Sequence, residues 1–193
     1  MPSLAPGPPL PGRRIVVLGV TGSGKTTLAA TLARRLGVPH VEMDSLHWDA
    51  GWTEAPDDVF RERTARALAG DAWVADGNYS KVRDIAWGRA DTLVWLDYPL
   101  SLILWRLVRR TTGRVITRVE LWNGNRESLR GALFSRDSLF IWALQTYKRR
   151  RIEYTTLPKQ PEYAHLQMIR LSSPAATRRW LAQVGALLPV AQQ

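Results

Sequence analysis

One stretch of eight residues constrains this chain more than any other. The sequence GVTGSGKT at residues 19–26 fits the pattern GxxxxGK[ST] at every specified position. The apolar run at residues 14–18 before it suits a buried strand, and residues 27–35 after it form a helix-favouring stretch. A strand, a glycine-rich loop and a helix in this order make a phosphate-binding loop (P-loop). The chain is therefore predicted to bind a nucleoside triphosphate.

The residue types of the P-loop match the chemistry of a phosphate cradle. Glycines let the backbone curl and point successive N–H groups at phosphate oxygens, and the following helix adds its positive N-terminal end. Lys25 then places a charge on the β and γ phosphates, and Thr26 offers a hydroxyl to Mg²⁺. A chance glycine-rich turn is the alternative. The residues predicted to hold the nucleotide are Gly19, Thr21, Gly22, Ser23, Gly24, Lys25, Thr26 and Thr27.

Length and composition limit the class of protein. A chain of 193 residues fits one domain with a small insert, and the absence of cysteine excludes disulfides, thiolate metal sites and cysteine nucleophiles. Residues 1–12 are rich in proline and glycine and carry no charged side chain, so a flexible leader is expected rather than a signal peptide. No apolar run approaches the roughly 18 residues of a membrane-spanning helix. The cytoplasm is the expected location, with no membrane partner.

The net charge of +10 favours anionic partners: nucleotides, phosphorylated metabolites, nucleic acid or acidic membrane surfaces. Much of the excess lies between Arg106 and Arg151, away from the P-loop in sequence, and it includes the basic run at residues 148–151. Charge alone does not choose among these partners. The sequence gives no prediction for the oligomeric state.

The remaining pattern alternates short apolar runs with helix-like segments. Strands are expected at 40–43, 72–75, 92–96 and 167–171, and helices at 56–68, from 99 to about 110, at 138–154 and at 174–187. This alternation favours a parallel sheet covered on both faces, with ligands at the carboxyl ends of the strands. Acidic residues follow several of these strands and should gather at the edge that carries the P-loop.

With these elements placed, the chain resembles the adenylate-kinase-like P-loop kinases, and within them the group labelled DNA topology modulation proteins. The resemblance covers nearly everything after residue 12. It rests on the P-loop and on the segments MDSLHW, GWTEAP, VADGNY, ADTLVWLDYP, LWRLVRRTTGRV and SRDSLFIWALQTYKRRR. It implies an α/β P-loop NTPase fold of three layers, with a five-stranded parallel sheet and a small, helical, arginine-rich lid. The single kinase domain would span residues 13–193, with the lid insert at about 111–137.

The resemblance also implies a metal ligand. Asp76 and Gly77 resemble the Asp-Gly pair with which nucleoside monophosphate kinases hold Mg²⁺ through water, so Asp76 is the predicted metal residue beside Thr26. A plain Asp-Gly turn is the alternative. Asp97 ranks second for the same role, with closing a strand and capping the helix that begins near Pro99 as its alternative. Monophosphate kinases usually continue Asp-Gly-Phe-Pro-Arg, whereas this chain reads DGNYS, and the missing arginine weakens the prediction of a nucleoside monophosphate acceptor. Arg83 or Lys81 is next in line to supply that charge.

Arg106 and Arg110 resemble the Arg-x-x-x-Arg pair that opens the lid of adenylate kinases and reaches the transferring phosphoryl group. Positive charge around that group supplies much of the rate of phosphoryl transfer. A solvated basic helix face is the alternative for both side chains. The further arginines that the lid offers are Arg114, Arg118, Arg126, Arg130 and Arg136.

Asp44 and Trp48 lie after the second expected strand, where related kinases recognise the acceptor. Asp44 is a candidate to orient or deprotonate an acceptor hydroxyl, with a helix cap as the alternative. Trp48 is a candidate to stack on the acceptor, with core packing as the alternative. His47 between them is expected to be a packed side chain rather than a proton carrier.

The first hypothesis is therefore an ATP-dependent phosphotransferase that moves the γ-phosphoryl group to a small acceptor, with a nucleotide or nucleoside as the leading choice. ATP and Mg²⁺ are the implied cofactors. A nucleic-acid-associated NTP-binding protein and a nucleotide-sensing switch are the alternatives. No zinc finger, RNP motif or leucine zipper supports the nucleic-acid alternative, so nucleic acid is not the favoured partner.

Overall fold

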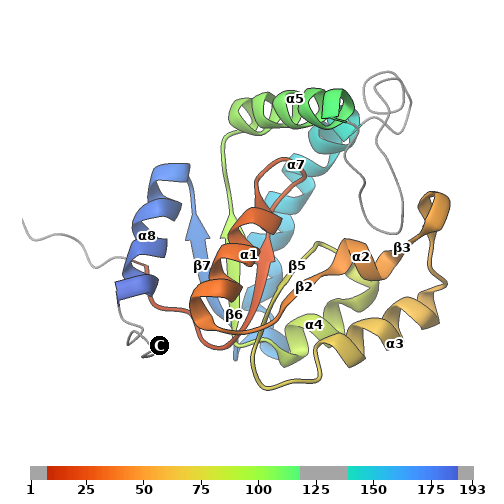
Figure 1. Ribbon diagram of the computed structural model, residues 1–193. Helices are drawn as coiled ribbons and strands as arrows, with labels where there is room; N and C mark the ends of the chain where they lie inside the picture. Colours follow the sequence, from red (N-terminus) through yellow and green to blue (C-terminus); the bar gives the residue numbers. More distant parts are fainter. Residues whose placement is uncertain (1–7, 118–138, 187–193) are drawn as a thin grey trace, which may run out of the picture.

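The computed structural model describes residues 8–117 and 139–186 (Figure 1). Its centre is a sheet of five strands in the order β2-β5-β1-β6-β7, and every neighbouring pair is parallel. The strands are β1 Arg14–Leu18, β2 His40–Glu42, β5 Trp73–Asp76, β6 Thr92–Leu96 and β7 Gln167–Leu171. This confirms the predicted α/β fold with a five-stranded parallel sheet.

Helices cover both faces of the sheet and complete three layers (Figure 1). One face is covered by α1 Lys25–Leu36 and α8 Pro174–Ala186, and the other by α3 Asp57–Ala67, α4 Arg83–Arg89 and α7 Leu139–Thr156. A short helix, α2 Met43–His47, follows β2, and a small hairpin of β3 Trp48–Asp49 and β4 Thr53–Glu54 comes next. Short 3₁₀ turns lie at Ala50–Trp52, Ser80–Val82, Leu157–Lys159 and Pro161–Tyr163.

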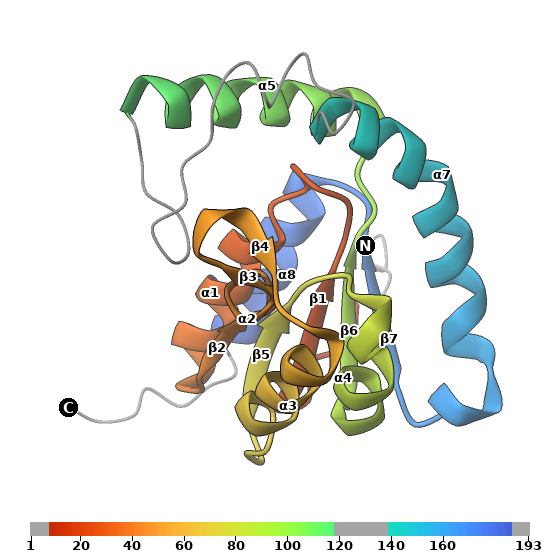
Figure 2. The same ribbon diagram turned by 90° about the vertical axis from the view of Figure 1, so that its right-hand side faces the viewer.

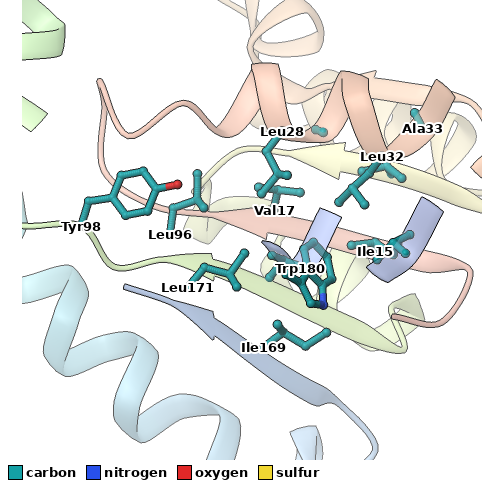
Figure 3. Packing of buried hydrophobic residues seen from close by; sticks show 14 of the residues in the cluster. Ile15, Val17, Leu28, Leu32, Ala33, Leu96, Tyr98, Ile169, Leu171 and Trp180 are labelled. Carbon is teal, nitrogen blue, oxygen red and sulfur yellow. The ribbon is translucent and has the colours of Figure 1, made fainter. Parts of the chain in front are cut away.

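Alternation along the strands divides the apolar core in two. Ile15 and Val17 of β1 belong to the cluster under α1 and α8, whereas Val16 and Leu18 belong to the cluster on the opposite face. Figure 3 shows the first cluster, in which the ring of Trp180 from α8 lies over the strands beside the leucines of α1. Because both faces are buried, β1 reads as a continuous apolar run rather than an alternating one.

Helix α5, Leu100–Thr117, crosses over the carboxyl ends of the strands and lies above the P-loop (Figures 1 and 2). The approach is close, because a Cβ atom built on Gly22 would lie 3.0 Å from the carbonyl oxygen of Ile103. The helix continues past the predicted end near Arg110. The predicted lid at about 111–137 therefore begins inside α5, and its residues 118–137 lie outside the described residues.

The chain before β1 is held to the domain at two points. The indole Nε1 of Trp180 donates to the carbonyl oxygen of Pro9 at 3.0 Å, and the backbone N–H of Gly12 donates to Oγ1 of Thr92 at 2.9 Å. Residues 8–12 of the predicted leader thus contact α8 and β6. Within the described part of the chain, none of the helices has the length and apolar character that crossing a membrane requires.

Candidate active site

The P-loop runs from the end of β1 to the start of α1, and its backbone has the conformation that its glycines allow. Gly19 has a φ of +150° and Gly22 a φ of +80°, backbone conformations that residues other than glycine rarely adopt. A Cβ atom on Gly19 would also lie 2.6 Å from Oγ of Ser23. Helix α1 begins at Lys25 with no acidic residue in its first turn. Its free N–H groups and positive dipole end therefore face the loop and suit a phosphate.

Lys25 of the P-loop lies near charged side chains from several other elements. Its Nζ donates to the carbonyl oxygen of Val20 at 3.4 Å. Removal from water lowers the pKa of Lys25, and the negative charges of Asp44 and Asp76 oppose that shift. The positive charges of Arg110 and Arg150 lower its pKa further. A bound triphosphate would favour the charged form of Lys25, because it brings negative charge to this desolvated ammonium group.

The two predicted metal residues are in direct contact. Oγ1 of Thr26 donates to Oδ2 of Asp76 at 2.7 Å, and Nε2 of His40 lies 2.8 Å from Oδ1 of the same carboxylate, which is 5% exposed. Among the described residues, no three His, Cys, Asp or Glu side chains are arranged to hold a metal by themselves. This pair fits Mg²⁺ bound beside a nucleotide, because Mg²⁺ takes few protein ligands and completes its shell with water and phosphate oxygens.

Asp97, the second candidate for the metal, is engaged in ion pairs. Nε of Arg151 lies 2.9 Å from Oδ1 of Asp97, and Nε of Arg170 donates to Oδ2 at 2.9 Å. The side chain of Asp97 is 2% exposed. Its negative charge already faces two guanidinium groups, so it is not placed to hold a cation.

The arginine pair of α5 points toward the P-loop. Nη1 of Arg106 donates to the carbonyl oxygen of Ser23 at 2.8 Å, and its guanidinium lies 5.1 Å from the ring centroid of Tyr98. Arg110 is half-buried and close enough to lower the pKa of Lys25. Neither side chain belongs to a solvated basic face, whereas Arg109 is exposed. Of the other lid arginines, Arg118, Arg126, Arg130 and Arg136 lie outside the described residues, as does the side chain of Arg114.

A small cavity that opens to solvent lies on the β5 side of the P-loop, between the sheet and helices α4 and α7, and its empty space of about 270 Å³ includes that open solvent. Polar groups and aromatic rings share its wall, contributed by Asn78, Tyr79, Arg83, Trp87, Arg150 and Tyr154. Such a mixture of apolar surface and a few polar groups is typical of a pocket for a small molecule. The predicted acceptor residue Arg83 is thus in the cavity wall.

Two arginines of the cavity share one carboxylate. Nη1 of Arg150 donates to Oε2 of Glu153 at 2.8 Å, and Nη2 of Arg83 donates to Oε1 of the same group. The guanidinium of Arg83 also lies 5.2 Å from the ring centroid of Trp87. Two positive charges and one negative charge leave this wall with one net positive charge. An anionic group on a ligand would be attracted to it.

Asp44 on α2 accepts a hydrogen bond from the hydroxyl of Tyr79 at 2.7 Å. Burial and the Asp44 charge raise the pKa of Tyr79, so its hydroxyl stays protonated as a donor. The side chain of Trp48 hydrogen-bonds to the same hydroxyl. Neither Asp44 nor Trp48 lines the cavity itself, and the ring of Trp48 lies edge-on to His47 at 4.9 Å between centroids. The three side chains form one network in which Trp48 and Tyr79 support Asp44.

His47 is a packed side chain, as predicted. It is 4% exposed and its ring contacts those of Phe60 and Tyr79 at centroid distances of 4.8 and 4.6 Å. Burial lowers its pKa, and the nearby Glu54 carboxylate opposes the shift. The imidazole is therefore held in its neutral form near neutral pH.

The structure adds residues that the sequence did not single out. The side-chain amide of Asn78 bonds to both backbone groups of Gly19, and the backbone carbonyl oxygen of Asn78 accepts from Nη2 of Arg150 at 2.9 Å. His40 contacts Asp76, and Glu153 joins Arg83 to Arg150. One signal for the Arg150–Glu153 pair was available in the sequence, namely their spacing of three positions on an expected helix. Asn78 was visible only as a departure from the Asp-Gly-Phe pattern.

The chain is similar to known kinases in sequence and in fold. No family model matches the chain. The chain is 30% identical over 151 residues to the shikimate kinase of Cereibacter sphaeroides, an alignment that covers 68% of this chain and 71% of the relative. It is 41% identical over 98 residues to the shikimate kinase of Symbiobacterium thermophilum, covering 43% and 56% of the two chains.

Solved structures share the fold. Shikimate kinase from Acinetobacter baumannii in complex with shikimate has a TM-score of 0.54 and 22% identity, and the match covers 95% of this chain and 96% of that one. A gluconokinase from Sinorhizobium meliloti 1021 has a TM-score of 0.51 and 21% identity, covering 92% and 95%. The alignment to the Cereibacter enzyme shows that the chain belongs to the shikimate kinase family, a family of P-loop kinases that act on small molecules.

Proposed function

We propose that the protein transfers the γ-phosphoryl group of ATP to a hydroxyl group of a small hydroxylated acid bound in the cavity. The observation that carries this proposal is the position of the cavity, whose wall contains Arg83 and Arg150 and which adjoins the P-loop through Asn78. The names of the relatives agree with it, because shikimate and gluconate both carry hydroxyl groups and a carboxylate.

The donor half of the reaction follows from the P-loop. The N–H groups of the loop and the ammonium of Lys25 would hold the β and γ phosphates of ATP. Thr26 and Asp76 would hold Mg²⁺, which neutralises phosphate charge when it is bound. Arg106 and Arg110 add positive charge above the loop. Preorganised charge of this kind favours the transition state, in which negative charge spreads over the transferring oxygens.

The acceptor half is inferred from the cavity and from Asp44, which the cavity residue Tyr79 contacts. The carboxylate of Asp44 would accept the proton of the attacking hydroxyl, while the hydroxyl of Tyr79 holds its Oδ1 in a fixed orientation. Arg83 and Arg150 would bind the carboxylate of the acceptor, and the ring of Trp87 would contact its carbon skeleton. One net positive charge on this wall matches one carboxylate better than it matches a doubly charged phosphate.

This proposal replaces the nucleotide or nucleoside as the leading acceptor. A nucleotide acceptor, a nucleic-acid-associated NTP-binding protein and a nucleotide-sensing switch remain as outcomes that the experiment below distinguishes. The narrower resemblance, to the DNA topology modulation proteins, stays a prediction.

The test is an acceptor panel. The protein is incubated with Mg·ATP and shikimate, gluconate, other hydroxylated acids, nucleosides or nucleoside monophosphates, and ADP release is followed. We expect release that depends on a hydroxylated acid and falls about 100-fold or more in Lys25→Ala, the size of effect seen when a charge-stabilising donor is removed. Chelation of Mg²⁺ should also abolish it. Arg83→Gln should raise KM for the acid more than it lowers kcat.

Other outcomes would overturn the proposal. ADP release that depends on nucleosides or nucleotides alone would identify a nucleotide kinase. ATP binding without release for any acceptor would point to the switch or to the nucleic-acid alternative.

A further inference from the structure

Asn78 lies in the turn after β5 and reaches the P-loop through its side chain. Its Nδ2 donates to the carbonyl oxygen of Gly19 at 2.5 Å, and the N–H of Gly19 donates to its Oδ1 at 3.4 Å. A carboxamide carries a donor and an acceptor side by side, so it can pair with both backbone groups of one residue. Gly19 is the first glycine of the P-loop, and these bonds fix where the loop leaves β1.

The backbone of the same residue reaches the acceptor cavity. The carbonyl oxygen of Asn78 accepts from Nη2 of Arg150 at 2.9 Å, and Arg150 is held in turn by Glu153. The next residue, Tyr79, donates to Asp44. A shift of this turn would therefore move Arg150, which binds the anion, together with Asp44, the candidate base. The side chain of Asn78 would move the P-loop at the same time.

We propose that Asn78 is a positioning residue that couples the nucleotide loop to the acceptor cavity. The proposal rests on the proposed function, because it assigns the two sites to the two substrates. Phosphoryl transfer depends on the separation and alignment of donor and acceptor, and a misplacement of about 1 Å costs about 100-fold in rate. Asn78 contacts both the P-loop and Arg150 of the acceptor cavity, so it sets the separation of donor and acceptor.

Two substitutions separate positioning from simple packing. Asn78→Ala removes both side-chain bonds. Asn78→Asp keeps the shape and an acceptor for the Gly19 N–H, but it places a carboxylate oxygen against the Gly19 carbonyl where Nδ2 donates now. Positioning predicts that both variants lose about 100-fold in kcat with a smaller change in KM. A packing role predicts that Asn78→Asp keeps nearly the native kcat. Thr155→Ala, on the exposed side of α7, is the matched control and should keep the native rate.

Hydrogen exchange gives a readout that needs no turnover. A non-hydrolysable ATP analogue with Mg²⁺ is added to the native protein and to Asn78→Ala, and exchange is compared in the P-loop, in residues 79–89 and in residues 147–154. We expect the analogue to slow exchange in all three segments of the native protein and in the P-loop alone in Asn78→Ala. Equal slowing of the two cavity segments in both proteins would overturn the coupling.

The failures of the two proposals are distinguishable. Absence of turnover with every acceptor would count against the proposed function, and the exchange comparison would still decide the role of Asn78. Turnover of a hydroxylated acid at the native rate by Asn78→Asp would overturn the present inference and leave the proposed function in place.

Discussion

Asp76 and Asp97 share one sequence context, an aspartate at the carboxyl end of a buried strand, but their surroundings differ. Asp76 accepts from the neutral hydroxyl of Thr26 and contacts His40, whereas Asp97 faces the guanidinium groups of Arg151 and Arg170. An aspartate that is paired with two cations attracts a third only weakly. At the scale of the residue, the partners therefore decide which carboxylate suits a metal.

His47 allows a prediction of pH dependence. Burial lowers its pKa in the folded protein below the ordinary value of 6.5. Between these two pKa values the unfolded chain binds more protons than the folded chain, so the stability that the neutral ring contributes is complete above pH 6.5 and falls as the pH decreases. The substitution His47→Phe keeps a ring in contact with Phe60 and Tyr79 but cannot bind a proton.

The measurement for His47 is the thermal midpoint of unfolding at pH 7.5 and pH 5.5. We expect the thermal midpoint of the native protein to fall more between pH 7.5 and pH 5.5 than the midpoint of His47→Phe does. The carboxylates of Glu54 and Asp44 and the ammonium of Lys81, which also act on this ring, remain in both proteins. An equal loss in the two proteins would assign the pH dependence to other groups.

At the scale of the elements, Asp97 connects the end of β6 to α7 and β7. Its partners come from both, Arg151 from α7 and Arg170 from β7. Helix α7 also carries Arg150 and Glu153, so this ion-pair cluster helps to place the wall of the cavity. The partners are 46% and 51% exposed, so water can solvate them when the carboxylate is lost.

The substitution Asp97→Asn should therefore cost about 1 to 3 kcal/mol of unfolding free energy, less than the loss from a fully buried pair. Urea unfolding measures it. The matched control is Asp84→Asn, which removes an exposed pair with Arg61 and should change stability by less than about 1 kcal/mol. If the two variants lost the same amount, the connection through Asp97 would not be a significant source of stability.

At the scale of the whole molecule, the net charge of +10 includes the basic run at residues 148–151. The four side chains of this run do not form one basic surface. Arg150 turns to Asn78 and Glu153, and Arg151 turns to Asp97. Lys148 and Arg149 are exposed, and Arg151 is exposed too although it pairs with Asp97. The run that suggested a nucleic-acid partner is thus divided between the cavity wall, an ion-pair cluster and solvent.

Binding to duplex DNA should accordingly be weak and independent of sequence. We expect fluorescence anisotropy to show an affinity that falls steeply between 50 and 200 mM salt, as nonspecific phosphate attraction does. Arg149→Ala should reduce the salt slope by about 0.9 at most, the contribution of one phosphate contact. Sequence-dependent binding that persists at 200 mM salt would contradict this and favour the nucleic-acid partner.

The sequence by itself determined the features that depend on local chemistry. The P-loop motif and its flanking runs predicted β1 and helix α1, and the bounds of β1, β6 and β7 were predicted at the observed residues. Apolar runs of five residues with helices between them are enough to indicate buried parallel strands. Helix α4, with seven residues, and the β3-β4 hairpin were missed, because such short elements show no clear period.

Only the tertiary structure decided how the site is assembled. Asn78 meets Gly19 across 59 positions, and Arg83 meets Glu153 across 70. No local pattern predicts such pairs, because they form only after parallel strands bring distant turns to one edge of the sheet and α7 packs beside them. The motif determined that the chain can cradle phosphate, whereas long-range packing determined which charges surround the acceptor cavity.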